Sequence, residues 1–214
     1  IQELKCLLKT KSIGTDSDRA LLLDFQATLE TKPEKAIKLE KDALAQIENI
    51  TADNARLVSN LHANLGGLYR MNGYPDLARE HMEKSISLLD QFNLLHINDS
   101  IPQIANYAMF LTEQQEPERG ISELQKLSGI IKEYHSDDCL DYAKVQETLA
   151  TIYQMTANLP QAKTHFKRAF KIYEKIWTDE PEMIEAKYQE IQELYPQVGF
   201  FLGQQLSDFL TKQT

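Results

Sequence analysis

Residues 65–85 of this chain read LGGLYRMNGYPDLAREHMEKS, and the alternation of small and large residues in this stretch recurs along the sequence. The step is 42 residues: Ala36, Ala78, Gly120 and Ala162 are all small and stand 42 positions apart. Four further series keep the same step: Gly66, Ala108 and Ala150; Tyr69, Leu111 and Tyr153; Met82, Leu124 and Phe166; Ser85, Leu127 and Ala169. A fixed period of this kind indicates a repeat protein, whose units bury their apolar faces against one another.

The spacing inside each unit is that of packed helices. Leu65 and Tyr69 lie four positions apart, as do Ala78 and Met82, and Ser85 follows three positions later. Residues three and four apart share one face of a helix, so each helix presents a single buried stripe. Two helices approach closely only where side chains are small, and large side chains fill the grooves between them. The pattern therefore predicts an all-α fold.

These residues resemble the tetratricopeptide repeat (TPR), a pair of antiparallel helices with a large, a small and an aromatic residue in the first helix. The resemblance implies a right-handed α-solenoid of about four helix pairs, with terminal capping helices. The predicted units are 17–50, 59–92, 101–134 and 143–176, separated by eight-residue spacers. The first unit departs from the pattern, because Asp24 stands where a small residue is expected and Glu40 where a large apolar one is.

A step of 42 residues, rather than 34, resembles the kinesin-light-chain type of repeat, in which the helices are longer. The proline that usually ends the second helix is absent here, since that position holds Glu48, Asp90, Lys132 and Glu174. Ahead of three of the helix pairs one position holds an aspartate, namely Asp53, Asp137 and Asp179, whereas Leu95 holds it ahead of the third unit. We expect these aspartates to cap the helices that follow, because an Asp side chain accepts hydrogen bonds from free backbone N–H groups. Gly120 replaces the alanine of the other units, so Gly120→Ala is expected to stabilise a helix with room for a methyl group.

We expect residues 1–214 to form a single solenoid domain whose two ends close the stack. Residues 1–12 carry apolar positions at helical spacing and are interpreted as an N-terminal cap or a half-repeat. Residues 181–214 are interpreted as a C-terminal helical pair that caps the last repeat. The apolar stretch Val198 to Leu210 leaves a second interpretation open, a surface through which the chain forms a homo-oligomer.

Composition narrows the classes of partner. The net charge is −9, with 23 Lys and Arg against 32 Asp and Glu. Nucleic-acid binding depends on neutralising phosphates with basic residues, and anionic membrane surfaces also attract basic segments, so we expect neither partner. No apolar run reaches the length of a membrane span and no signal peptide is apparent, so a cytoplasmic location is expected. The two cysteines, Cys6 and Cys139, are expected to be reduced thiols.

The resemblance implies a concave groove, lined by the first helix of each unit, that binds an extended peptide. The groove position just before the large apolar residue holds Asn64, Asn106 and Thr148. Asparagine offers a donor and an acceptor, so it can pair with both the N–H and the C=O of a peptide. Neighbouring groove positions hold Asn60, Arg70, Gln103, Lys144 and Gln154. A solvated asparagine, or one bonded to a neighbouring helix, and ordinary surface charges are the alternatives for these residues.

The sequence offers no catalytic or cofactor motif. The histidines are scattered without a nucleophile beside them, and the residues around Cys139 match no structural zinc pattern. We therefore expect no enzyme, no metal and no cofactor. The leading hypothesis is a protein–protein interaction scaffold that holds a peptide or helix of a partner in its groove. The alternative is the sensor or regulatory TPR domain of a larger regulator, such as a peptide-responsive transcription factor or a signalling ATPase.

Overall fold

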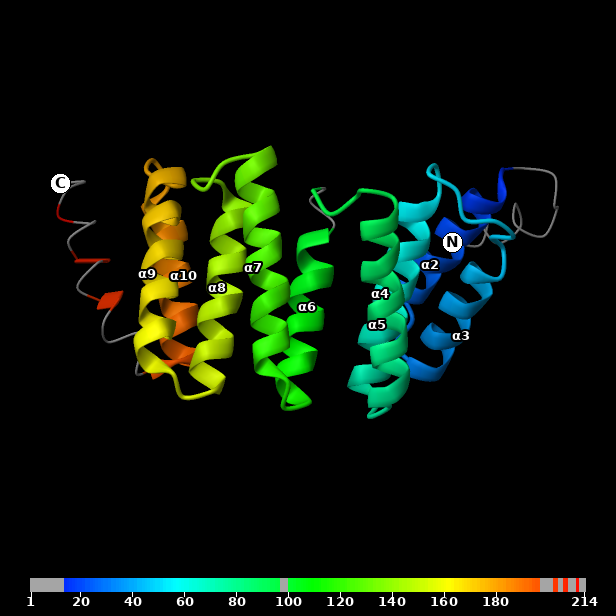
Figure 1. Ribbon diagram of the computed structural model, residues 1–214, viewed down its shortest axis with the longest axis horizontal. Helices are drawn as coiled ribbons and strands as arrows, with labels where there is room; N and C mark the ends of the chain where they lie inside the picture. Colours follow the sequence, from blue (N-terminus) through cyan, green and yellow to red (C-terminus); the bar gives the residue numbers. More distant parts are fainter. Residues whose placement is uncertain (1–13, 97–99, 197–201, 204–205, 208–210, 212–214) are drawn as a thin grey trace. The chain divides into compact units, whose positions relative to one another are not determined.

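The fold is seen in a computed structural model that describes residues 14–96, 100–196, 202–203, 206–207 and 211. Over these residues it contains helices and no strand (Figure 1). The helices are α2 (Asp16–Thr28), α3 (Pro33–Leu44), α4 (Ala55–Met71), α5 (Pro75–Gln91), α6 (Ser100–Glu113), α7 (Pro117–Tyr134), α8 (Leu140–Met155), α9 (Leu159–Ile176) and α10 (Pro181–Leu194). Residues 1–12 and most of the tail after Tyr195 lie outside the described residues, so the interpretation of both ends stays a prediction.

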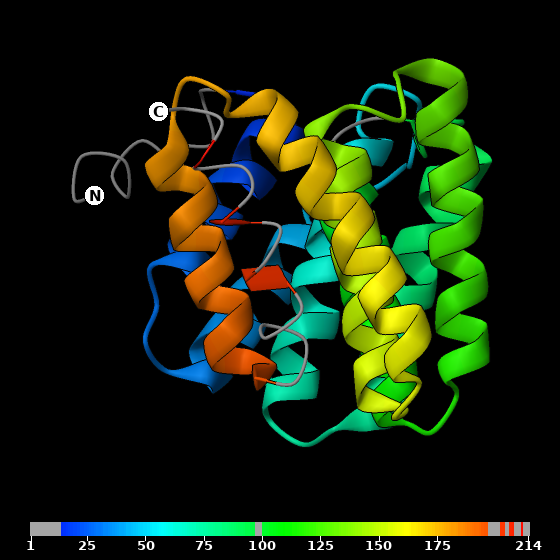
Figure 2. The ribbon, with the colours of Figure 1, turned by 90° about the vertical axis from the view of Figure 1, so that its left-hand side faces the viewer.

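The chain divides into two compact units, Ile1–Gln103 and Ile104–Thr214, with the boundary inside α6. In the first unit α2 packs against α3, and α4 against α5, with α3 also in contact with α4. In the second unit α7 packs against α8, and α8 against α9. Figure 2 shows α9 (yellow) and α10 (orange) running in opposite directions. Each predicted repeat of 34 residues therefore contains one helix pair, and the exact repeat boundaries stay a prediction.

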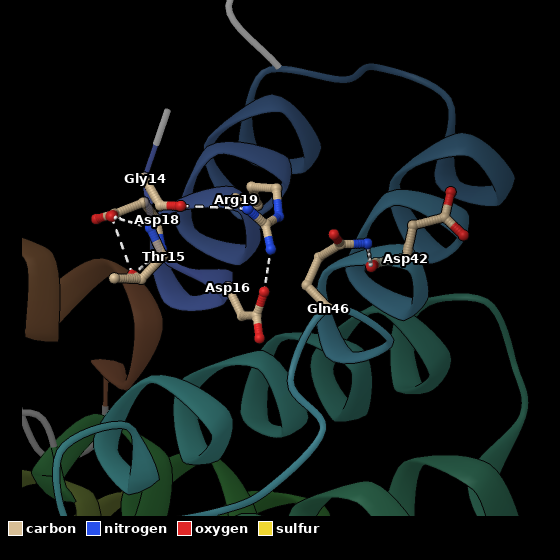
Figure 3. Close-up of polar contacts among 7 residues, drawn as sticks. All are labelled: Gly14, Thr15, Asp16, Asp18, Arg19, Asp42 and Gln46. Carbon is tan, nitrogen blue, oxygen red and sulfur yellow. Dashed lines mark hydrogen bonds and ion pairs between the residues drawn. The ribbon is translucent and has the colours of Figure 1, made fainter. Parts of the chain in front are cut away.

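The start of α2 shows how a helix end is specified locally (Figure 3). Thr15 Oγ1 accepts a hydrogen bond from the backbone N–H of Asp18 at 3.2 Å, and Asp18 Oδ2 accepts from the N–H of Thr15 at 2.7 Å. This reciprocal capping box satisfies two of the N–H groups that a helix start leaves unpaired. The Thr15 bonds also hold the pKa of the Asp18 carboxyl below its usual value.

The turns inside the helix pairs follow the 42-residue step. Gly73, Gln115 and Ala157 all have a positive φ, of 76°, 65° and 59°. In each turn the next residue donates its N–H to a carbonyl five positions earlier, such as that of Tyr74 to Tyr69 O at 3.0 Å. This is the left-handed helix end that glycine adopts without strain. Gln115 and Ala157 thus adopt a left-handed backbone conformation that is unfavourable for a residue with a side chain.

The series that define the period form the core, as predicted. Ala78, Ala162, Leu124 and Phe166 are fully buried in their units. The other members of the five series are buried as well, except for Tyr153, which is half-buried. The small and large positions of the pattern are therefore the contact positions of the helices.

Gly120 lies at a contact between the backbones of two helices. In the second unit it lies so close to α6 that an added Cβ would stand 2.7 Å from the backbone oxygen of Ala108. The expectation that Gly120→Ala is stabilising is therefore wrong, because this site is a close approach of two helix backbones that leaves no room for a methyl group.

The predicted aspartate caps are also wrong. The residues at the N-cap positions of α4, α8 and α10 are Asn54, Cys139 and Glu180, each one or two positions after the aspartate. Cys139 Sγ accepts from the N–H of Tyr142 at 3.4 Å, a weak bond, and the other two side chains make no capping bond. The N-cap residues of these three helices therefore lie one or two positions after the predicted aspartates.

Candidate functional site

The second unit contains a cavity of about 430 Å³. It lies among α6, α8, α9 and α10, so the first helices of two successive pairs supply most of its wall. Its lining residues are Ala105, Asn106, Met109, Leu140, Lys144, Glu147, Thr148, Thr151, Tyr173, Trp177 and Lys187. A cavity of this size holds one or two side chains of a bound peptide or a small molecule.

One end of the cavity is built around the Glu147 carboxylate. Glu147 accepts a hydrogen bond from the Tyr173 hydroxyl at 2.6 Å and forms an ion pair with Lys187 Nζ at 3.2 Å. Lys187 also pairs with Glu190 at 2.8 Å. Burial and the adjacent Glu147 carboxylate raise the pKa of the Tyr173 hydroxyl far above its usual value, so the hydroxyl stays a donor. Burial alone would lower the pKa of Lys187, but its bonds to Glu190 and Glu147 outweigh burial and raise it.

An aromatic stack forms the adjoining wall. The rings of Tyr173 and Trp177 lie 4.8 Å apart at an interplanar angle of 11°. Tyr173 is buried and Trp177 is half-buried, so the indole of Trp177 is the more accessible ring of the stack. Together with Met109 and Leu140 the stack makes the wall mostly apolar, while Glu147 and Lys187 supply fixed charges. This arrangement suits a ligand with an apolar group and a few polar groups.

Three of the eight predicted groove residues line this cavity, namely Asn106, Lys144 and Thr148. Asn106 and Lys144 are exposed, and Lys144 lies 3.7 Å from Asp141 in a surface ion pair. Thr148 is half-buried and its hydroxyl donates to the Lys144 carbonyl at 3.0 Å. Gln154, also on α8, is half-buried and is not among the lining residues.

The other four predicted residues lie in the first unit, where several bond within the fold. Gln103 is only 9% exposed, and its Oε1 accepts from Ser59 at 2.8 Å and Ser85 at 2.5 Å. Its Nε2 donates to Asn60 Oδ1 at 2.5 Å. Asn64 is exposed, and its Nδ2 donates to Asp24 at 2.9 Å and Glu40 at 3.2 Å. Arg70 is half-buried at the end of α4.

The chain is similar to one known protein family and to several solved structures. A model of the tetratricopeptide repeat matches residues 100–175. No curated protein sequence matches the chain. The crystal structure of BtubC (BKLC) from P. vanneervenii is similar with a TM-score of 0.72 and 18% identity, over 99% of this chain and 84% of that one.

Two further similar structures have nearly identical TPR-like repeats. Both are crystal structures of a candidate kinesin light chain from Podosopora anserina, one of them with a single substitution. Their TM-scores are 0.68 and 0.65, at 14% identity, over 82% and 81% of this chain and 85% of each of theirs. The family model bears out the recognition of tetratricopeptide repeats over the residues that it matches. The similar structures confirm the all-α solenoid fold class. TPR solenoids generally act as protein-interaction scaffolds and are typically not enzymes.

Five polar or aromatic residues of the cavity were not predicted: Glu147, Thr151, Tyr173, Trp177 and Lys187. Tyr173 and Trp177 belong to a second helix and its cap, whereas the family pattern assigns the groove to first helices. Trp177 is the single tryptophan of the chain and follows the last predicted repeat, and this position was the one signal that could have marked it. Lys187 lies in α10, beyond the last repeat, so no repeat position predicts it.

The described part of the chain contains no group of three or more His, Cys, Asp and Glu residues arranged to hold a metal ion. Among the described helices, none is long and apolar enough to cross a membrane. Cys139 is a free thiol at the start of α8. The candidate site is therefore the cavity of the second unit.

Proposed function

We propose that the chain is a protein-interaction scaffold that holds a segment of a partner in the cavity of the second unit. The observation that carries this proposal is the convergence of Asn106, Lys144 and Thr148 on one cavity that also has an aromatic wall. The asparagine amide offers a donor and an acceptor to a peptide backbone. The apolar wall offers burial to a side chain of the partner. The segment is an extended peptide or one face of a helix.

The proposal is tested by closing the cavity with a side chain. Thr148→Phe places a ring at the half-buried wall, whereas Thr164→Phe places the same ring on an exposed position of α9. The two threonines are closely matched, because each donates its hydroxyl to the carbonyl four residues earlier, at 3.0 Å and 2.9 Å. Phage-displayed random dodecapeptides, selected on the immobilised chain, supply the probe. The most enriched peptide is then synthesised for affinity measurements.

We expect Thr148→Phe to weaken binding of this peptide at least tenfold and Thr164→Phe to leave it unchanged. Circular dichroism of both variants establishes that the helices are retained. Lys144→Ala, compared with Lys167→Ala on the exposed face of α9, then measures what the cavity lysine contributes. Equal affinity of wild type and Thr148→Phe would place peptide binding outside this cavity, and selection of no peptide would remove the proposal.

A further inference from the structure

The first unit carries an acidic cluster that the cavity does not involve. It consists of Asp24 on α2, Glu40 on α3 and Asn64 on α4. The single amide nitrogen of Asn64 donates to both carboxyl groups, at 2.9 Å to Asp24 Oδ1 and 3.2 Å to Glu40 Oε1. Asp24 is half-buried and Asn64 is exposed, so the cluster reaches the surface through these two residues.

Glu40 is the unusual member of the cluster, because it is 2% exposed and occupies the position of Met82, Leu124 and Phe166 in the other repeats. Among the described residues no donor reaches its second oxygen, Oε2. Asp24 faces Glu40 from α2, and the group that faces it from α4 is the uncharged amide of Asn64. Burial and the Asp24 carboxylate raise the pKa of Glu40 to about 8, so at neutral pH Glu40 keeps a proton.

The surface beside the cluster is apolar. Leu21 and Phe25 are 50% and 53% exposed on α2, on either side of Asp24 in the sequence, and Leu29 continues the same row. Lysine and arginine side chains combine an apolar stem with a cationic head, and a cation also binds favourably over an aromatic face. The carboxyl groups of Asp24 and Glu40, next to the apolar row on α2, are thus complementary to a basic side chain and would repel an acidic one.

We propose that Asp24, Glu40 and Asn64 form a recognition site for a lysine or arginine side chain of the partner, with Leu21 and Phe25 packing on its stem. The inference rests on the proposed function, since it takes the ligand to be a protein segment. An ammonium or guanidinium carries three to five N–H donors, which supplies the donor that Glu40 Oε2 lacks. When the cation binds, the Glu40 proton passes to solvent and Glu40 becomes a carboxylate paired with the cation.

The experiment uses the same library of random dodecapeptides, selected on the whole chain at pH 8. We expect enrichment of sequences with Lys or Arg at a fixed position. The best peptide and its analogue with norleucine in place of that residue are then titrated calorimetrically against the wild type. Glu40→Gln and Asp24→Asn should each weaken the basic peptide at least tenfold and leave the norleucine analogue unaffected.

Asp42→Asn is the matched control for these variants, because it removes a carboxyl group from an exposed position of α3. In Figure 3 the backbone oxygen of Asp42 accepts from Gln46 Nε2, at 3.2 Å, and this bond survives the substitution. Glu40→Gln is expected to fold, since a neutral glutamine amide has nearly the shape and size of the protonated carboxyl. Circular dichroism checks the helicity of each variant.

Proton linkage supplies a second readout. For the wild type, the affinity of the basic peptide should rise about five- to tenfold per pH unit between pH 6 and pH 8, because binding must first remove the Glu40 proton. Titrations in phosphate and in Tris should reveal this proton as a difference in apparent enthalpy. Glu40→Gln should abolish both effects.

The outcomes separate this inference from the proposed function. Selected peptides that lack a preference for Lys or Arg, or that bind Glu40→Gln as tightly as the wild type, would make the cluster a purely structural proton-sharing pair. In that case sensitivity to Thr148→Phe would still support the cavity. Selection of no peptide by the wild type would remove both proposals together.

Discussion

Glu40 is a residue whose burial couples folding to pH. Its pKa is raised from 4.5 to about 8, so the folded chain keeps a proton that the unfolded chain releases above pH 4.5. Between these values the folded state binds more protons, and the free energy of unfolding therefore falls as the pH rises. Glu40→Gln removes this dependence and is expected to be more stable than wild type at pH 8.5, by on the order of 3 kcal/mol, and about equal at pH 4.

Urea unfolding monitored by circular dichroism from pH 4 to pH 8.5 measures this effect. Glu34→Gln, an exposed position on the same helix, is the control and should keep the slope of the wild type. If Glu40→Gln shows the wild-type slope, then Glu40 is ionised in the folded chain and its environment is less apolar than the burial indicates.

Histidine and tyrosine also repeat along the chain, but at twice the period. His81 stacks on Tyr69 at 5.5 Å in the first unit, and His165 stacks on Tyr153 at 5.3 Å in the second, 84 residues later. Each of the two histidines also forms a hydrogen bond through Nδ1 to the facing helix. The partner of His81 is His62 Nδ1, at 2.8 Å, and the partner of His165 is Gln146 Oε1, at 2.9 Å. Burial lowers the pKa of His81 and His165 alike. Both pairs thus keep neutral imidazoles between their helices.

The helix pairs are the scale at which the small residues act, and α7 contains a matched pair of glycines. A Cβ at Gly120 would meet the backbone of Ala108, whereas a Cβ at Gly129 would meet nothing within 4 Å. Gly120→Ala should therefore destabilise the chain by about 1–3 kcal/mol, because a backbone cannot yield as a side chain can. Gly129→Ala should stabilise it by about 0.5–1 kcal/mol, because alanine loses less entropy in a helix.

Thermal unfolding of the two variants beside the wild type measures this difference. Melting temperatures that shift in the same direction would contradict the structural assignment, since the two substitutions are chemically identical. A stabilised Gly120→Ala would mean that α6 and α7 are further apart than in the structure.

The turn between α8 and α9 offers a stabilising substitution. Ala157 has a φ of 59° and is exposed, and the equivalent turn between α4 and α5 has glycine at this position. Ala157→Gly should raise the free energy of unfolding by about 1 kcal/mol, because a Cβ in the left-handed region costs about 1–2 kcal/mol and the entropy of glycine offsets part of the gain. Gly73→Ala should lower it, and chemical denaturation of both variants gives the comparison. A destabilised Ala157→Gly would indicate that this turn does not hold a positive φ.

The helix pairs could be predicted from the sequence because the spacing of 42 is carried by residues such as Leu124 and Phe166, whose burial depends on local periodicity. The failure at Gly120 has a physical cause: a pattern indicates that a residue must be small, but it does not give the distance between two backbones. For the same reason the first unit appeared irregular. Asp24 and Glu40 break the pattern singly, and only their proximity in space makes them a cluster.

At the scale of the molecule, some of the predicted groove residues line a cavity and others form hydrogen bonds within the fold. Asn106 and Thr148 were predictable because the family pattern fixes where a first helix points. Gln103 was not, since its bonds to Ser59 and Ser85 depend on residues 44 and 18 positions away. Trp177 and Lys187 come from a helix end and from a helix outside the repeats, which no periodic argument reaches. A repeat pattern thus predicts the cavity residues that lie on first helices better than those at helix ends or outside the repeats.

Net charge acts over the whole chain and leads to a prediction about binding kinetics. The charge of −9 creates a field that attracts a basic peptide during diffusion and is screened by salt. For a Lys-containing peptide selected on the chain, raising the NaCl concentration from about 50 to about 500 mM should lower the association rate constant about tenfold and change the dissociation rate constant much less. The norleucine analogue should show a smaller change in both. Surface plasmon resonance resolves the two rates, and a salt effect confined to dissociation would show that the charge acts only through close contacts.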